Sequence, residues 1–402
     1  MGRLALWKQI VIAIIVGILV GVYLPGVVPK ITFLGEIFMR LLKMLIAPLV
    51  LFTLISGVCK MGDIKQLRTV GVRIVSFYLI ASAIAASLGM LFALVSQPGK
   101  GVIELLGAQS GKAVEYSFLD NMISWIPTNI FEALSTGNTL QIIVFAIFLG
   151  TIFLALGEVA RPAVKFVDSM SEAMIKMTDM VMVISPIGIF ALIADMVTKL
   201  SGKMLGEVLN MIVTDWVACV LMIFIIQPVA VKLMTGLNPV RFLKNCMPAL
   251  LVAASTTSSA ATLPMAMKCA DRELGVPENI YGFSLPLGNT CNMNGMAIAL
   301  GVISIFASNV YGLEITMAEM IQFVFLGLVL SVGCAGVKGA GIVMSTVLLQ
   351  TLGLPLDIVP LLAAIWPLID IGHTTANISG DLVGTTIVAD SLGALNRDVY
   401  NK

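Results

Sequence analysis

Long unbroken runs of hydrophobic residues occupy most of the chain. A run of about 20 apolar residues is long enough to cross a bilayer as a helix. Such runs predict an all-α polytopic membrane protein with eight spans, near residues 9–25, 31–57, 69–97, 118–156, 163–199, 207–236, 278–308 and 357–392. The fourth and fifth are long enough to be tilted, broken or followed by surface helix.

Two further apolar segments, near 240–268 and 319–352, are interrupted by small and polar residues. The interruptions read ASTTSSAAT (254–262) and GCAGVKGAG (333–341). Irregular backbone at membrane depth is tolerated only where protein or a water-filled cavity covers it. We therefore expect two re-entrant helical hairpins with these stretches at their tips. Hairpins that enter from opposite faces indicate inverted repeats, which place substrate and ion sites where the broken elements meet.

Composition and charge narrow the class of protein. The chain is 58% hydrophobic and 12% charged, which is more apolar and less charged than a soluble domain. A net charge of +1 gives no reason to expect a nucleic-acid partner. Lys and Arg gather on one side when the spans alternate, which predicts that both termini are cytoplasmic. The six cysteines form no C-x-x-C pair, so neither a zinc site nor a disulfide framework is indicated.

The segment DIGHTTANISGD (370–381) places polar residues inside the last span. At about 100° per residue, a helix projects Asp370, Asn377 and Asp381 along one stripe, with Thr374 beside them and His373 at its edge. Carboxylates within a bilayer are costly, which indicates that the stripe faces a cavity or a cation. A hydrogen-bond network that serves helix packing is the alternative.

The segment GNTCNMNG (288–295) interrupts the seventh span in the same way. Glycine, asparagine and threonine predict local unwinding, which frees carbonyl oxygens. These oxygens, with Asn, Thr and Asp side chains, suit a cation such as Na⁺. A glycine kink that allows close packing is the alternative.

Four motifs follow one another on hairpin, span, hairpin and span: ASTTSSAATLP, PLGNTCNMNG, GVKGAG and DIGHTTANISGD. Over essentially the whole chain they resemble the dicarboxylate/amino acid:cation symporters, the glutamate-transporter fold, on its neutral amino-acid-like branch. The resemblance implies a homotrimer and an elevator-type mechanism. It implies a scaffold of residues 1–68 and 118–200, with spans one, two, four and five. The moving transport domain would comprise residues 69–117, with span three, and 201–402, with span six, hairpin one, span seven, hairpin two and span eight.

The resemblance also implies roles for individual residues. Asp370 would pair with the substrate α-ammonium, and Ser258 and Ser259 would meet its carboxylate. The residues implied around the substrate are Thr257, Ser258, Ser259, Met296, Val337, Lys338, Gly339, Gly341, Asp370, His373, Thr374 and Asn377. The implied Na⁺ ligands are Gly288, Asn292, Asn377 and Asp381 at one site, Thr290 and Ser331 at a second, and Tyr78, Ser82 and Asn294 at the remnant of a third.

Departures from the family pattern bear on substrate and ions. Acidic-substrate members carry an arginine where this chain has His373, and an imidazole cannot fork two hydrogen bonds to a carboxylate. This favours a neutral amino acid such as serine, threonine or alanine, with His373 donating to its side chain or only packing. The alternative is an acidic amino acid or C4-dicarboxylate, neutralised by protonated His373 or Lys338. Asn294 and Ala81 replace an aspartate and a threonine of the third site, so two coupled Na⁺ ions are expected.

The expected function is therefore a secondary active symporter of the prokaryotic cytoplasmic (inner) membrane, which couples inward Na⁺ movement to amino-acid uptake. Lys338 would reach solvent, contact the substrate or replace a cation. An ion channel would share the intramembrane carboxylates and re-entrant loops. A membrane enzyme built on Ser259, His373 and Asp370 is disfavoured, because the chain has no nucleophile-elbow pattern, no H-E-x-x-H and no second histidine.

Overall fold

Helices make up all the regular structure of the described part of the chain. The computed structural model describes residues 6–59, 70–101, 123, 126–137, 139–199, 202–332 and 340–401, and no strand occurs in these ranges. Five helical stretches there are long and apolar enough to cross a membrane: Val72–Ser96, Val144–Met174, Gly206–Thr235, Glu278–Val310 and Val359–Ser391. The all-α membrane fold is confirmed.

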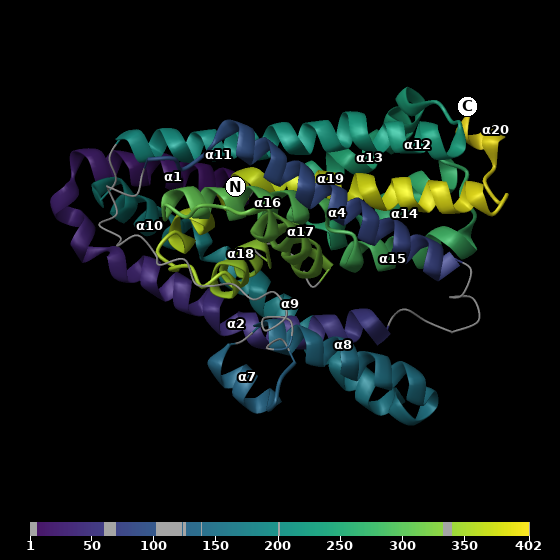
Figure 1. The fold of residues 1–402 in the computed structure, drawn as a ribbon, viewed down its shortest axis with the longest axis horizontal. Coiled ribbons are helices and arrows are strands. Elements are labelled where there is room, and N and C mark those ends of the chain that lie inside the picture. The colour runs from purple at the N-terminus through teal and green to yellow at the C-terminus, as the bar shows by residue number, and fades with distance from the viewer. Residues whose placement is uncertain are drawn as a thin grey trace, which may run out of the picture.

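The helices form two groups that pack mainly within themselves (Figure 1). α7 and α8 lie at the bottom of that view, whereas α11, α12 and α13 run along the top and α19 passes between them. The first group contains α1 (Leu6–Tyr23), η1 (Pro25–Lys30), α2 (Thr32–Cys59), α7 (Ile130–Thr136), α8 (Thr139–Leu156), η3 (Gly157–Ala160), α9 (Arg161–Val183) and α10 (Ser185–Lys199). The second contains α4 (Val72–Ser96), α11 (Gly202–Leu221), η4 (Met222–Ile226), α12 (Gln227–Thr235), α13 (Pro239–Thr256), α14 (Ser259–Arg272), α15 (Glu278–Cys291), α16 (Asn294–Val310), α17 (Met317–Val332), α18 (Ala340–Thr351), α19 (Val359–Ser391) and α20 (Arg397–Tyr400).

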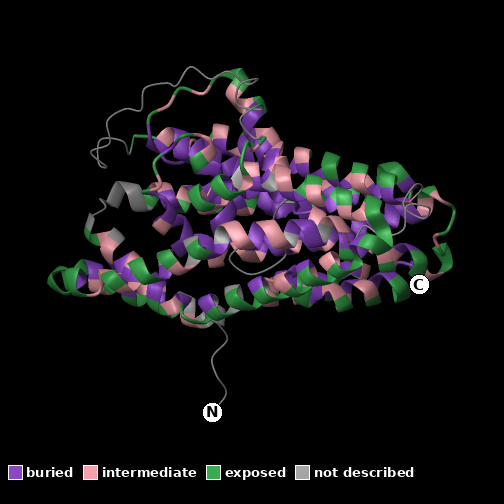
Figure 2. Ribbon diagram, turned by 90° about the horizontal axis from the view of Figure 1, so that it is seen from below, coloured by how far each residue is buried: buried purple, intermediate pink, exposed green. Residues whose placement is uncertain are grey.

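Exposed residues lie along the outer faces of these helices (Figure 2), and many of them are large and apolar. Val95 on α4 is 85% exposed, and Phe148 on α8 is 68% exposed. A soluble monomer rarely leaves so much apolar surface uncovered. Lipid therefore replaces water as the solvent of these faces.

The fourth and fifth predicted spans are both broken, which is one of the outcomes that their length allowed. In 118–156, α7 ends at Gly137, whose φ of +70° terminates the helix in the left-handed region. In 163–199, α9 and α10 separate at Ile184. Pro186 follows in the first turn of α10, where its missing N–H is not needed. The two pieces then take different partners, since α9 packs on α2 and α10 packs mainly on α1.

Helix α1 crosses α10 at unusually short range. A Cβ built on Gly17 would lie 2.9 Å from the Phe190 carbonyl oxygen, and one on Gly21 would lie 2.8 Å from the Ala194 oxygen. Two glycines spaced four apart allow membrane helices to approach backbone to backbone. This pair therefore positions α1 within the first group.

The first predicted hairpin is present as α13 and α14, joined at Thr257 and Ser258. Thr257 has a φ of +49°, and the Ser258 Oγ accepts a hydrogen bond from the Ala261 N–H at 3.3 Å. The turn and the N-cap of α14 therefore come from the polar interruption itself. The second hairpin consists of α17 and α18, and residues 333–339 of its predicted tip lie outside the described residues.

The start of α13 is held by one asparagine. The Asn238 Oδ1 accepts hydrogen bonds from the N–H groups of Val240 at 2.9 Å and Arg241 at 3.2 Å. Its carbonyl oxygen accepts a hydrogen bond from the Tyr400 hydroxyl at 2.8 Å. Burial raises the pKa of Tyr400, so this hydroxyl stays a donor at neutral pH.

Asn238→Ala is expected to reduce the free energy of unfolding by about 1 kcal/mol, because two N–H groups lose their cap. Melting temperature in detergent measures this change. Asn279→Ala is the matched control, since Asn279 is exposed in the first turn of α15. Equal shifts in the two variants would contradict the capping role.

Candidate functional site

The seventh span unwinds where the sequence predicts. Between α15 and α16 the backbone leaves the helical region, with φ −120° and ψ 81° at Asn292 and φ −108° and ψ 62° at Met293. Both helices pack against α19. The break therefore brings free backbone groups to the polar stripe of the last span.

Amide groups connect this break to α19 in the protein interior. The Asn292 Nδ2 donates to the Asp381 Oδ1 at 2.7 Å and to the Asn377 carbonyl oxygen at 3.5 Å. The Gly295 N–H donates to the Asn377 Oδ1 at 2.7 Å. Asp381 is only 1% exposed. Its hydrogen bond comes from a neutral amide rather than from a cationic side chain.

Gly288 lies directly against this carboxylate. A Cβ there would be 2.5 Å from the Asp381 Oδ1 and 2.6 Å from the Tyr78 hydroxyl, so only glycine lets the carboxylate approach α15. The Asn292 Oδ1 is buried with no hydrogen-bond partner among the described residues. Carboxylate, amide and backbone oxygens are the ligands that hard cations take. The residues expected at the first Na⁺ site thus lie together and are chemically suited to one.

The residues of the expected third site also lie close to this cluster. The Ser82 Oγ donates to the Asn294 Oδ1 at 3.4 Å, and the Tyr78 hydroxyl donates to the Ser284 carbonyl oxygen at 3.0 Å. Gln227, which the sequence analysis missed, joins them at the π turn η4 that leads into α12. The Gln227 Nε2 and the Asn294 Nδ2 both lie within 3.0 Å of a Cβ built on Gly380. This second polar cluster contains amides and hydroxyls but no carboxylate.

Thr290 and Ser331, expected at the second Na⁺ site, each bond to their own helix. The Thr290 Oγ1 donates to the Leu287 carbonyl oxygen at 2.9 Å, and the Ser331 Oγ donates to the Leu328 oxygen at 2.8 Å. Within the described ranges no hydrogen bond joins the two residues. The helices that carry them, α15 and α17, are in contact, and the second Na⁺ site stays a prediction.

The residues expected around the substrate come from three elements. At the tip of the first hairpin, Thr257 and Ser258 are half-buried and Ser259 is buried. On α16 and α19, Met296 and Thr374 are buried, and Asp370 is half-buried. A Cβ on Gly341 would overlap the Trp366 ring, so the start of α18 lies on this part of α19. Val337, Lys338 and Gly339 fall outside the described residues.

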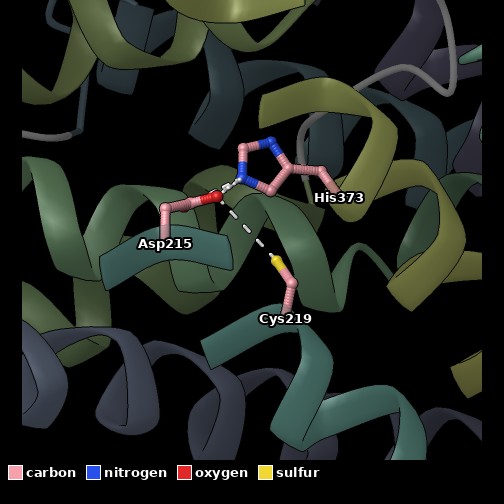
Figure 3. Close-up of side chains that lie close together, drawn as sticks. All are labelled: Asp215, Cys219 and His373. Atoms are coloured by element: carbon pink, nitrogen blue, oxygen red, sulfur yellow. Dashed lines mark hydrogen bonds and ion pairs between the residues drawn. The ribbon is translucent and has the colours of Figure 1, made fainter. Parts of the chain in front are cut away.

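His373 takes a partner that the sequence analysis did not foresee (Figure 3). Its Nε2 lies 2.9 Å and 2.8 Å from the two carboxylate oxygens of Asp215, on α11, and both side chains are 1% exposed. The Cys219 Sγ lies 3.9 Å from the Asp215 Oδ2. The Trp366 ring covers the imidazole at a centroid distance of 5.3 Å. A lone aspartate in the apolar run MIVTDWVACVL is the signal that could have identified Asp215.

In this helical membrane protein, a hairpin and an unwound span pack together around buried carboxylate, amide and hydroxyl groups. This construction is typical of a secondary transporter. The sequence profile of the sodium:dicarboxylate symporter family matches residues 6–391. The chain therefore belongs to this family, which confirms the resemblance and the expectation that it is not an enzyme.

Relatives with named activities align over nearly the whole chain. A proton/sodium-glutamate symport protein of Bacillus caldotenax is 31% identical over 99% of this chain and 97% of its own. A proton/glutamate-aspartate symporter of Escherichia coli (strain K12) is 30% identical, covering 96% and 93%. A C4-dicarboxylate transport protein of Bacillus subtilis (strain 168) is 28% identical, covering 95% and 92%. These names support symport, but they refer to acidic substrates, so they do not support the expected neutral amino acid.

Proposed function

We propose that the protein is a Na⁺-coupled symporter of the bacterial cytoplasmic membrane that takes up a small amino acid, for which an acidic side chain is the first candidate. The buried oxygen cluster of Gly288, Asn292, Asn377 and Asp381 carries the coupling part of this proposal. This carboxylate is 1% exposed, and its hydrogen bond among the described residues comes from a neutral amide, so it needs a positive counter-charge, which a visiting cation supplies. The names of the relatives support the acidic substrate and admit protons as coupling ions.

Asp370 favours an amino acid over a C4-dicarboxylate. It is half-buried on α19, about one helical turn before His373. Its carboxylate would pair with an α-ammonium, while Ser258 and Ser259 at the inner tip would donate to the α-carboxylate. A dicarboxylate without an ammonium group would instead bring like charges together.

A specific observation favours a second candidate, a small neutral amino acid. His373 stands where acidic-substrate members carry arginine, and Asp215 already occupies its Nε2. A substrate with a hydroxyl or amide side chain would not need the missing cationic partner.

The domain division and the elevator mechanism remain part of the proposal. Residues 1–68 and 118–200 would form the static scaffold of a homotrimer, and residues 69–117 and 201–402 would move. The separate packing of the two helix groups supports this division. Two coupled Na⁺ ions and cytoplasmic termini belong to the same proposal, and Asn294 in place of a carboxylate supports the lower ion number.

Uptake into proteoliposomes tests the proposal. Labelled aspartate, glutamate, succinate, serine, threonine and alanine would be offered with a Na⁺ gradient, with a proton gradient, and with neither. Saturable accumulation of an amino acid that depends on the Na⁺ gradient is expected, and would exclude a channel. Accumulation that follows only the proton gradient would contradict Na⁺ coupling. The absence of any gradient-driven accumulation would contradict the function as a whole.

Asp370→Asn is expected to weaken substrate binding by about 100-fold or more, because the ammonium loses its counter-charge in a desolvated site. Stabilisation of the detergent-solubilised protein by substrate in the presence of Na⁺ measures this loss. Asp357→Asn, an exposed position just before α19, is the control. If Asp370→Asn binds as wild type does, the α-ammonium assignment is wrong.

A further inference from the structure

Where α11 packs against α19, the buried Asp215 of α11 contacts His373 of α19, the one histidine of the chain. The Asp215 carboxylate bonds through both oxygens to the His373 Nε2, at 2.9 Å and 2.8 Å. Among the described residues, the titratable groups beside this ring are Asp215 and Cys219 from α11, and the charge of Asp370 acts on the ring from α19. Each of these three groups can be neutral or negative, and none can carry a positive charge. Among the described residues, no lysine or arginine forms an ion pair with Asp215 or His373.

The net charge of the pair follows from counting. A neutral imidazole beside an aspartate carries a charge of −1, and an imidazolium beside an aspartate carries zero. An unpaired arginine at the His373 position would instead provide +1. A second carboxylate on the substrate would therefore meet no net positive charge from this pair.

The remaining ring nitrogen indicates which side chain would fit. The His373 Nδ1 is buried without a hydrogen-bond partner in the described part of the chain. When the neutral ring donates from Nε2 to Asp215, its Nδ1 can only accept a hydrogen bond. A substrate hydroxyl or amide can donate to that nitrogen, whereas an ionised carboxylate can accept a hydrogen bond from it only when the ring is an imidazolium, whose charge Asp215 already offsets.

We infer that Asp215 is a specificity-determining residue: it bonds to His373 in the way that a side-chain carboxylate of the substrate otherwise would, and so restricts the site to amino acids with uncharged, hydrogen-bond-donating side chains. Asp215 acts through His373 rather than by touching the substrate. The inference rests on the proposed amino-acid symport and decides between its two candidate substrates in favour of serine-like and asparagine-like side chains.

Four proteins test this role: wild type, His373→Arg, Asp215→Asn/His373→Arg, and the uncharged control Asp215→Asn/His373→Gln. L-serine and L-aspartate are the probes. Thermal stabilisation with Na⁺ reports binding, and Na⁺-driven uptake into proteoliposomes reports transport. Monodispersity in detergent and a cooperative melt, recorded without amino acid, show that each variant is folded.

Wild type is expected to bind L-serine more tightly than L-aspartate. His373→Arg alone should gain little L-aspartate affinity, because Asp215 neutralises the new guanidinium. Removing Asp215 as well should raise L-aspartate affinity by about tenfold or more over the single variant, while the glutamine control gains none. A purely structural role for Asp215 would not change the ratio of the two affinities.

Two results would overturn the inference. One is an equal L-aspartate affinity in His373→Arg and in the double variant. The other is tighter binding of L-aspartate than of L-serine by wild type. If the double variant does not fold, the wild-type preference and the His373→Arg measurement still decide. If either result is obtained while Na⁺-driven uptake is observed, only the inference about Asp215 is contradicted, and the proposed symport is not. The absence of binding and uptake in all four proteins would contradict both the inference and the proposed symport.

Discussion

Asp381→Asn is expected to abolish Na⁺-driven uptake and to lower apparent Na⁺ affinity by about 100-fold or more. The carboxylate is 1% exposed and accepts a hydrogen bond from the Asn292 amide at 2.7 Å. Ionised and buried without a cationic partner, it would be strongly unfavourable. A bound cation offsets that cost, and the isosteric amide removes the charge that attracts the cation while leaving the shape unchanged.

Uptake and substrate-induced stabilisation, both measured against Na⁺ concentration, check this prediction. Asp390→Asn is the matched control on the same helix, because Asp390 pairs at 2.7 Å with the exposed Arg397 near the end of α19. A surface ion pair of that kind contributes little. If Asp381→Asn keeps the Na⁺ dependence of wild type, the cluster at the break of span seven does not bind the coupling ion.

Gly295→Ala is expected to destabilise the protein by about 3 kcal/mol and to eliminate uptake. A Cβ at this position would lie 2.2 Å from the His373 Cα and 2.3 Å from its carbonyl oxygen. Backbone within a long helix cannot yield as a side-chain end can, so α16 and α19 must separate. The hydrogen bond from the Gly295 N–H to the Asn377 Oδ1 would be lost in the process.

Gly282→Ala provides the control for this change. Gly282 also lies within a helix, α15, but nothing stands within 4 Å of a Cβ there. Alanine at an unobstructed helical position is expected to be neutral or slightly stabilising, since it lowers the entropy of the unfolded chain. Similar melting temperatures for Gly295→Ala and Gly282→Ala would show that the approach of α16 to α19 is not tight.

Local pattern was sufficient for most of the architecture. Polar residues inside apolar runs predicted the turn between α13 and α14 and the unwinding at Asn292 and Met293. They do so because lipid cannot satisfy free backbone groups, so every interruption of a span is conspicuous in the sequence. The precise breaks of spans four and five were not assigned, although Gly137 lies in the polar stretch STGNT (135–139) and Ile184 directly precedes Ser185 and Pro186.

The period of a helix was likewise enough to place Asn377 and Asp381 on one face of α19, and the resemblance supplied their neighbours on α15. The placement of His373 was different. Its partner Asp215 stands 158 positions earlier in the chain, and a single aspartate in an apolar span has no periodicity that points to a partner. Which side chain it meets depends on the crossing and rotation of α11 against α19. The charge around His373 is therefore determined by helix packing in the tertiary structure. The membrane fold and its polar centre, by contrast, were predictable from the order of apolar and polar residues in the sequence.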